Sequence, residues 1–254
     1  MIGFTEAQIM EWVSPIFWPF LRVLAVFTSA PVLSARSHPV RSRVALAFLI
    51  ALCAQAGLPE QEVVSLNDRA ALGLAMQQVV IGVAIGLAAR VVLSAVEMAG
   101  DLIGLQMGLN FAGFFDPATS SQSSTVGRFF GNTTMLVFVV LNGHLLLVHT
   151  VIASFTTFPL SEDTLSVITH MKLHELGALI FSYGLLISLP MIGILLFINT
   201  VLGILSRVAP QMNAFAIGFP LTVSGGLLGL AFTLPMLEQP LIRLITVVSD
   251  VFAR

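Results

Sequence analysis

Charged and ionisable side chains within the apolar stretches of the chain are the first candidates for chemistry. Such groups are costly to bury in hydrocarbon, so inside a membrane they mark functional or assembly sites. Depending on their neighbours, they can relay protons, pair with one another or bind a partner subunit. The candidates are Arg22, Arg90, Glu97, Asp101 and Arg128, together with the weaker pair His144 and His149.

No motif for covalent or metal-dependent catalysis accompanies these groups. His174 and Glu175 are adjacent, but the pattern does not continue to the second histidine of a zinc peptidase. Ser224 precedes two glycines without the flanking residues of a nucleophile elbow. The sequence also has no phosphate-binding loop and no cluster with metal-ligand spacing. We therefore expect no catalytic residues, no metal, no cofactor and no enzymatic activity.

The composition is that of an integral membrane protein. Of the 254 residues, 57% are hydrophobic and 9% are charged, whereas soluble domains carry about 25% charged residues. Residues 70–89 are interrupted only by Gln77 and Gln78, and residues 214–237 contain no charge. Both stretches reach the roughly 20 residues that a spanning helix needs. The net charge of −2 provides no basic surface for nucleic acid.

We predict an all-α fold of about six apolar segments that form a single membrane-embedded domain over residues 1–254. Prolines interrupt these segments, so we expect broken or kinked helices packed against other protein. Pro190 suggests that the fifth segment is two half-length helices or a hairpin, and Pro220 and Pro235 interrupt the sixth. The predicted segments cover residues 12–34, 44–58, 70–96, 126–158, 173–205 and 214–237.

Glycines and charges share one face of the helix predicted over residues 70–108. At 3.6 residues per turn, these side chains fall within a wedge of about 100°. Each interior glycine costs about 1 kcal/mol relative to alanine, so the pattern needs a cause. It indicates either close packing between helices of this chain or contact with a partner subunit. The wedge contains Gly82, Gly86, Gly100, Gly104 and Gly108 with Arg90, Glu97 and Asp101. Arg22 can pair with Glu97 or Asp101.

An aromatic segment follows this helix. Asn110, Gly113 and the pair Asp116-Pro117 are expected to end the helix. The three phenylalanines must be buried or fill a cavity, because they would promote aggregation in water. They either lie in the membrane interface or form a hydrophobic stopper in a pathway. The phenylalanines are Phe111, Phe114 and Phe115, and residues 120–125 provide slack for movement.

Two motifs resemble those of the FliR family, whose members are a subunit of the flagellar type III secretion export gate. SRVAPQMNAFAIGFPL at 206–221 is similar to the C-terminal signature of that family, and AGDLIGLQMGLNFAGFFDP at 99–117 is similar to its middle motif. The resemblance implies one copy that assembles with FliP and FliQ into a hetero-oligomeric gate of bent hairpins, with FlhB alongside. It also implies a place in the bacterial inner membrane at the flagellar basal body, and unfolded flagellar export substrates as cargo.

The resemblance also assigns candidate residues. It implies a plug loop in the closed channel, formed by Gly108, Leu109, Asn110, Phe111, Ala112, Gly113, Phe114, Phe115, Asp116 and Pro117. Apart from the resemblance, we predict a role in helix packing or assembly for Gly82, Gly86, Gly100, Gly104, Arg207, Pro210, Gln211, Asn213, Gly218 and Pro220. The group from Arg207 to Asn213 forms either an internal turn or a partner contact.

Two alternatives stay open from the residues. One is a proton-coupled small-molecule transporter, in which Arg90, Glu97 and Asp101 line a site in the membrane. The other is the equivalent subunit of a virulence injectisome. A transporter would act as a monomer or homo-oligomer, whereas a gate subunit would not exist alone.

Overall fold

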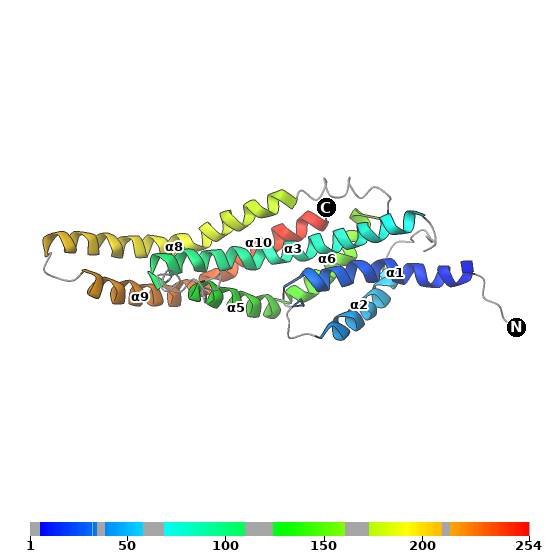
Figure 1. The fold of residues 1–254 in the computed structure, drawn as a ribbon, viewed down its shortest axis with the longest axis horizontal. Helices are drawn as coiled ribbons and strands as arrows, with labels where there is room; N and C mark the ends of the chain where they lie inside the picture. Colours follow the sequence, from blue (N-terminus) through cyan, green and yellow to red (C-terminus); the bar gives the residue numbers. More distant parts are fainter. Residues whose placement is uncertain are drawn as a thin grey trace. The chain divides into compact units, whose positions relative to one another are not determined.

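The computed structural model describes residues 6–31, 33–34, 39–57, 69–109, 124–160, 173–209 and 214–253. Within these ranges every regular element is a helix, which confirms the all-α prediction. The elements, labelled in Figure 1, are α1 (Glu6–Ser29), α2 (Val40–Ala54), α3 (Arg69–Gln106), α5 (Thr125–Val140), α6 (Gly143–Thr157), α8 (Leu173–Val208), α9 (Ala214–Thr233) and α10 (Glu238–Ala253), with short 3-10 turns η1 (Gln55–Gly57) and η3 (Leu234–Leu237).

The six predicted segments correspond to α1, α2, α3, the pair α5 and α6, α8 and α9. Four helical stretches in the described ranges are long and apolar enough to cross a membrane: Met10–Ser29, Ala70–Gln106, His174–Val208 and Ala216–Thr233. The pair α5 and α6 is bent by 68° and adds a fifth if it is one broken span. At 15 residues, α2 is shorter than the hydrocarbon layer requires.

The helix breaks differ from those that prolines predicted. The break expected at Pro190 is wrong, because α8 continues through this residue, although it changes direction along its length (Figure 1). Pro220 also lies inside α9. Proline removes one helical hydrogen bond and bends a helix, but the apolar residues on either side continue it. The unpredicted break is at Asn142, whose φ of 57° is left-handed, a conformation that asparagine tolerates.

The end of the chain carries a helix that the apolar pattern did not predict. Pro235 lies in η3, where α9 gives way to α10. Helix α10 begins with Glu238 and includes Arg243, so it does not form an apolar run. Leu241 and Leu244 are buried, whereas Arg243 is exposed. The helix is therefore amphipathic.

The chain divides into two compact units. Unit 1 comprises Met1–Val91, Phe138–Leu176 and Thr246–Arg254, and unit 2 comprises Val92–Val137 and Gly177–Ile245. Helix α3 contributes its first part to unit 1 and its second part to unit 2. The single domain over residues 1–254 stays a prediction.

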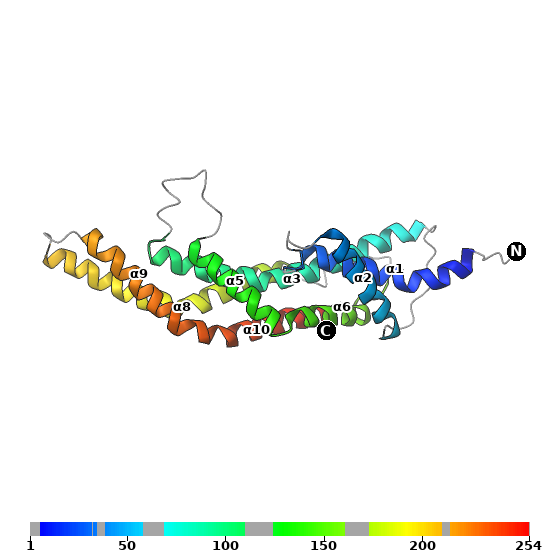
Figure 2. The same ribbon diagram turned by 90° about the horizontal axis from the view of Figure 1, so that it is seen from below.

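Small residues bring the helices of unit 1 together. Helix α2 packs beside α1 (Figure 2) and buries only three alanines, Ala47, Ala51 and Ala54. Trp18 of α1 packs in a cluster with Ala71 and Leu74 of α3.

In unit 2, the second part of α3 runs along α5, and α8 runs beside α9 (Figures 1 and 2). Methionine side chains lie over glycines at several of these contacts. A Cβ at Gly229 of α9 would lie 2.6 Å from the Met191 sulfur of α8, and one at Gly226 would lie 2.6 Å from the Met107 sulfur. The methionine side chains thus fill the space that these glycines leave open.

Candidate gating and helix-packing site

A buried arginine joins the helices of unit 1. Arg22 of α1 has no exposed surface. Its Nε donates to Gln78 Oε1 of α3 at 2.8 Å, and its Nη1 donates to Ser154 Oγ of α6 at 2.9 Å. Its Nη2 donates to the carbonyl oxygen of Phe158, just after α6, at 2.9 Å. The guanidinium therefore connects three helices through one side chain.

The surroundings of Arg22 stabilise its charge without a carboxylate among the described residues. The guanidinium carbon lies 3.6 Å from the centroid of the Phe155 ring, a distance typical of a cation–π contact. Ser154 donates its own proton to Val151 O at 2.6 Å, so its oxygen is free to accept from Arg22. The expected pairing of Arg22 with Glu97 or Asp101 is wrong. Neutral acceptors and an aromatic ring take that place instead.

A second glutamine extends the network. Gln78 Nε2 donates to Gln77 Oε1 at 3.1 Å, and Gln77 Nε2 lies 3.5 Å from the carbonyl oxygen of Pro159, at the outer limit for a hydrogen bond. Both glutamines are fully buried. In the sequence they only interrupt an apolar run. Two adjacent amides at membrane depth require polar partners, and that requirement was the signal that could have linked them to Arg22.

Two glycines of α3 allow α1 to approach closely. A Cβ at Gly82 would overlap the carbonyl oxygen of Arg22 and would lie 2.6 Å from Ala25 Cβ. A Cβ at Gly86 would overlap Ser29 Oγ and would lie 2.8 Å from the backbone nitrogen of Ala30. Both glycines therefore pack against a helix of the same chain.

The next glycine along α3 packs against a different helix, within unit 2. A Cβ at Gly100 would lie 2.7 Å from Gly127 Cα and 2.9 Å from Val126 O, both on α5. No side chain fits between these backbones. Gly104 is also buried.

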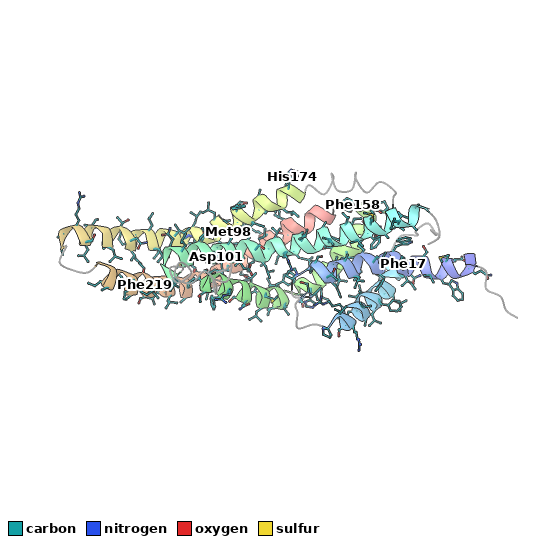
Figure 3. All side chains as sticks on the ribbon, viewed as in Figure 1. Phe17, Met98, Asp101, Phe158, His174 and Phe219 are labelled. Carbon is teal, nitrogen blue, oxygen red and sulfur yellow. The ribbon has the colours of Figure 1, made fainter. Side chains whose placement is uncertain are left out.

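The two acidic residues of α3 lie beside this close contact. A Cβ at Gly131 of α5 would lie 2.6 Å from Glu97 Oε1, and a Cβ at Gly127 would overlap Asp101 Oδ1. Asp101, labelled in Figure 3, also accepts a hydrogen bond from the backbone nitrogen of Ser124 at 2.8 Å. Both carboxylates thus face the backbone of α5.

The end of α3 is held by α9. Met107 is fully buried, and Gly108 takes a left-handed φ of 78°, which ends the helix. The hydroxyl of Thr222 on α9 lies 3.3 Å from the carbonyl oxygen of Met107 and 3.0 Å from that of Phe219, so it can donate to either. Of the predicted plug, Gly108 and Leu109 are the two residues that the structure describes.

The remaining candidate residues are separate from these contacts or lie outside the described residues. Arg90, Arg128 and Arg207 are exposed in the described chain, as is Pro220. A Cβ at Gly218 would lie 3.5 Å from Leu202 Cδ1, an ordinary contact. The remaining predictions concern positions outside the described residues, namely Asn110, Phe111, Ala112, Gly113, Phe114, Phe115, Asp116, Pro117, Pro210, Gln211 and Asn213.

The described structure is that of an all-α membrane protein whose polar groups join helices. Residues 13–247 match the family described as "Bacterial export proteins, family 1". The chain is 40% identical over 237 residues to the flagellar biosynthetic protein FliR of Escherichia coli (strain K12), covering 93% of this chain and 90% of that protein.

Further relatives extend the similarity over the whole chain. It is 38% identical over 253 residues to the FliR protein of Pectobacterium carotovorum subsp. carotovorum, covering 100% of this chain and 97% of the relative. The FliR protein of Bacillus subtilis (strain 168) is 27% identical over 212 residues, or 81% of this chain and 80% of that protein. The chain belongs to the FliR family of bacterial export proteins, as its two motifs predicted, and it is a membrane-embedded flagellar export component.

Proposed function

We propose that this chain is a structural and gating subunit of the flagellar type III protein export channel. In this proposal residues 108–117 form a plug in the closed pore, and unfolded flagellar substrates displace it. The subunit assembles with FliP and FliQ, with FlhB alongside, in the inner membrane at the basal body. Membership in the family of export proteins supports an export role.

The residues that flank 110–123 on each side are anchored within unit 2, and this observation supports the plug proposal. On one side, Thr222 and Gly226 contact Met107, next to Gly108. On the other side, Asp101 binds the backbone of Ser124. Asp101 and Met107 are six residues apart on α3, which is about 9 Å along a helix. A segment whose ends are anchored this close together can block a pore and return after displacement.

The apolar surface of unit 2 supports an assembly with other subunits. Only 22% of the apolar stretch of α8 is buried within the chain, compared with 67% of the apolar stretch of α3. Phe181, Phe197 and Ile204 are among the large apolar side chains that α8 leaves exposed. Such a surface requires lipid or neighbouring subunits around it, as a gate in a membrane would provide.

The plug proposal is tested by replacing residues 110–123 with a short Gly-Ser linker in the assembled complex and measuring its conductance in planar bilayers. We expect a higher ion leak than in the unchanged complex. A matched variant replaces Phe111, Phe114 and Phe115 with alanine and keeps the length of the segment. It should leak as well, because the rings provide the seal. Unchanged conductance of the linker variant would reject the plug role.

The contacts of the acidic residues favour the gate over a proton-coupled carrier. Asp101 is hydrogen bonded to Ser124, and the Glu97 carboxylate lies against Gly131. Both groups therefore hold α5 on α3, whereas a carrier would use them to bind a proton or a substrate.

A further inference from the structure

We propose that Asp101 completes the N-terminal cap of α5 from the neighbouring helix α3 and thereby positions the segment that precedes α5. Asp101 is then a positioning residue for gating, because it fixes the N-cap residue Ser124, the first described residue after residues 110–123. This inference rests on the proposed plug function.

The start of α5 has half of a capping box. The carbonyl oxygen of Ser124 accepts a hydrogen bond from the backbone nitrogen of Arg128 at 2.9 Å, and its hydroxyl oxygen accepts one from the backbone nitrogen of Gly127 at 2.9 Å. These two bonds define Ser124 as the N-cap residue. In a complete capping box, a Glu or Gln at the third helical position would accept the N–H of the N-cap residue itself. That position here is Gly127, which has no side chain to do so.

Asp101 supplies the missing acceptor. Its Oδ1 accepts the N–H of Ser124 at 2.8 Å. A carboxylate at this place also faces the positive end of the α5 dipole. The cap of α5 is therefore made by two helices, and the position of Ser124 depends on α3.

The glycine at position 127 is explained by the same contact. A Cβ there would overlap Asp101 Oδ1, so a capping glutamate or even an alanine would displace the aspartate. The contact between Glu97 and Gly131 repeats this arrangement one helical turn further along. Two acid–glycine contacts thus set the register of α5 on α3.

Removing the Asp101 carboxylate should release Ser124 without separating the two helices. Helix α5 also buries Val126 and Phe130, which are 5% and 1% exposed, and the close contact between Gly100 and Gly127 does not involve the aspartate side chain. We therefore expect the Asp101→Ala chain to assemble into the gate but to lose the hydrogen bond that fixes Ser124. The phenotype should be a leak and not a loss of the complex.

The test compares Asp101→Ala with Asp101→Asn and with the control Asn132→Ala, which truncates an exposed residue of α5. All are made in the full chain and purified as the assembled complex. Asp101→Ala should raise the leak conductance about tenfold. Losing a hydrogen bond to a charged group changes an equilibrium constant by about that factor or more. Asp101→Asn retains an acceptor oxygen and should recover most of the seal. The control should behave as the unchanged chain.

A second readout measures the register of α5 directly. Spin labels at Leu105 and Asn132, both exposed, report the distance between α3 and α5 in a Cys53→Ser background. Asp101→Ala should broaden the distance distribution, and Asp101→Asn should not. Gly127→Ala, which displaces the carboxylate but leaves its charge, should leak and broaden the distribution in the same way.

The outcomes separate this inference from the plug proposal. If the linker variant leaks but Asp101→Ala seals normally with an unchanged distance, the plug stands and the role of Asp101 is overturned. If the linker variant does not leak, the plug proposal is rejected. If the distance between α3 and α5 is also unchanged in Asp101→Ala, the role of Asp101 in setting the register of α5 is overturned as well. If both Asp101→Ala and Gly127→Ala fail to assemble, the contact serves folding and the gating role is overturned.

Discussion

The guanidinium of Arg22 lies over the ring of Phe155, with its carbon 3.6 Å from the ring centroid. The two residues belong to α1 and α6, which are far apart in the sequence. An arginine alone at the centre of a membrane helix costs several kcal/mol. The aromatic ring and the three hydrogen-bond acceptors of unit 1 offset that cost, so the charge holds helices of one chain together.

The first prediction concerns this buried charge. Arg22→Leu should destabilise the protein by about 2–4 kcal/mol, because it leaves Gln78, Ser154 and the Phe158 carbonyl oxygen without their donor. Arg22→Lys should recover only part of this loss, since an ammonium group cannot reach three separate acceptors with the geometry of a guanidinium. The unfolding temperature of the purified complex measures both effects. Arg90→Leu removes an exposed arginine in unit 1 and serves as the control. An Arg22→Leu complex as stable as the control would contradict the account of this site.

The second prediction concerns the close contact between α3 and α1. Gly86→Ala places a methyl group against Ser29 Oγ and the Ala30 backbone, and Gly82→Ala places one against the Arg22 carbonyl oxygen. We expect each to reduce the yield of assembled complex by separating the helices. Gly73→Ala is the matched control on the same helix, because a Cβ there has nothing within 4 Å. It should stabilise the helix by up to about 1 kcal/mol. Equal yields for Gly86→Ala and Gly73→Ala would show that the contact is not tight.

The third prediction separates glycines that face backbone from glycines that face methionine. Gly100→Ala meets the backbone of α5, which cannot move without shifting the helix, whereas Gly226→Ala and Gly229→Ala meet the flexible ends of Met107 and Met191. Methionine adapts to a changed cavity. Thermal unfolding should therefore show a large loss for Gly100→Ala and a loss below about 1.5 kcal/mol for the other two. The reverse order would contradict the packing of unit 2.

Much of the fold follows from the sequence, because apolar runs of membrane length form helices whatever their neighbours. The glycine pattern of α3 predicts a packing face, and Gly82, Gly86 and Gly100 lie in close helix contacts. The pattern did not show that this face meets α1 in its first part and α5 in its second. A repeat on one helix carries no information about which helix covers it.

The polar contacts were less predictable for a physical reason. The sequence suggests an opposite charge for Arg22, but three neutral acceptors from α3 and the end of α6 suffice when each is well placed. The shared cap between Asp101 and Ser124 joins residues 23 positions apart, so no local motif announces it. Pro190 does not break α8, because a helix with apolar residues on both sides can bend at a proline and continue.

Assembly is the most direct test of the central claim that this chain is a subunit of an export gate. The measurement is native mass spectrometry of the tagged chain extracted from its own cell in mild detergent. We expect one copy of the chain in a large complex with several copies of other small membrane proteins. A monomer or homodimer that persists under these conditions would contradict it, and Arg90, Glu97 and Asp101 would then be tested as a transport site.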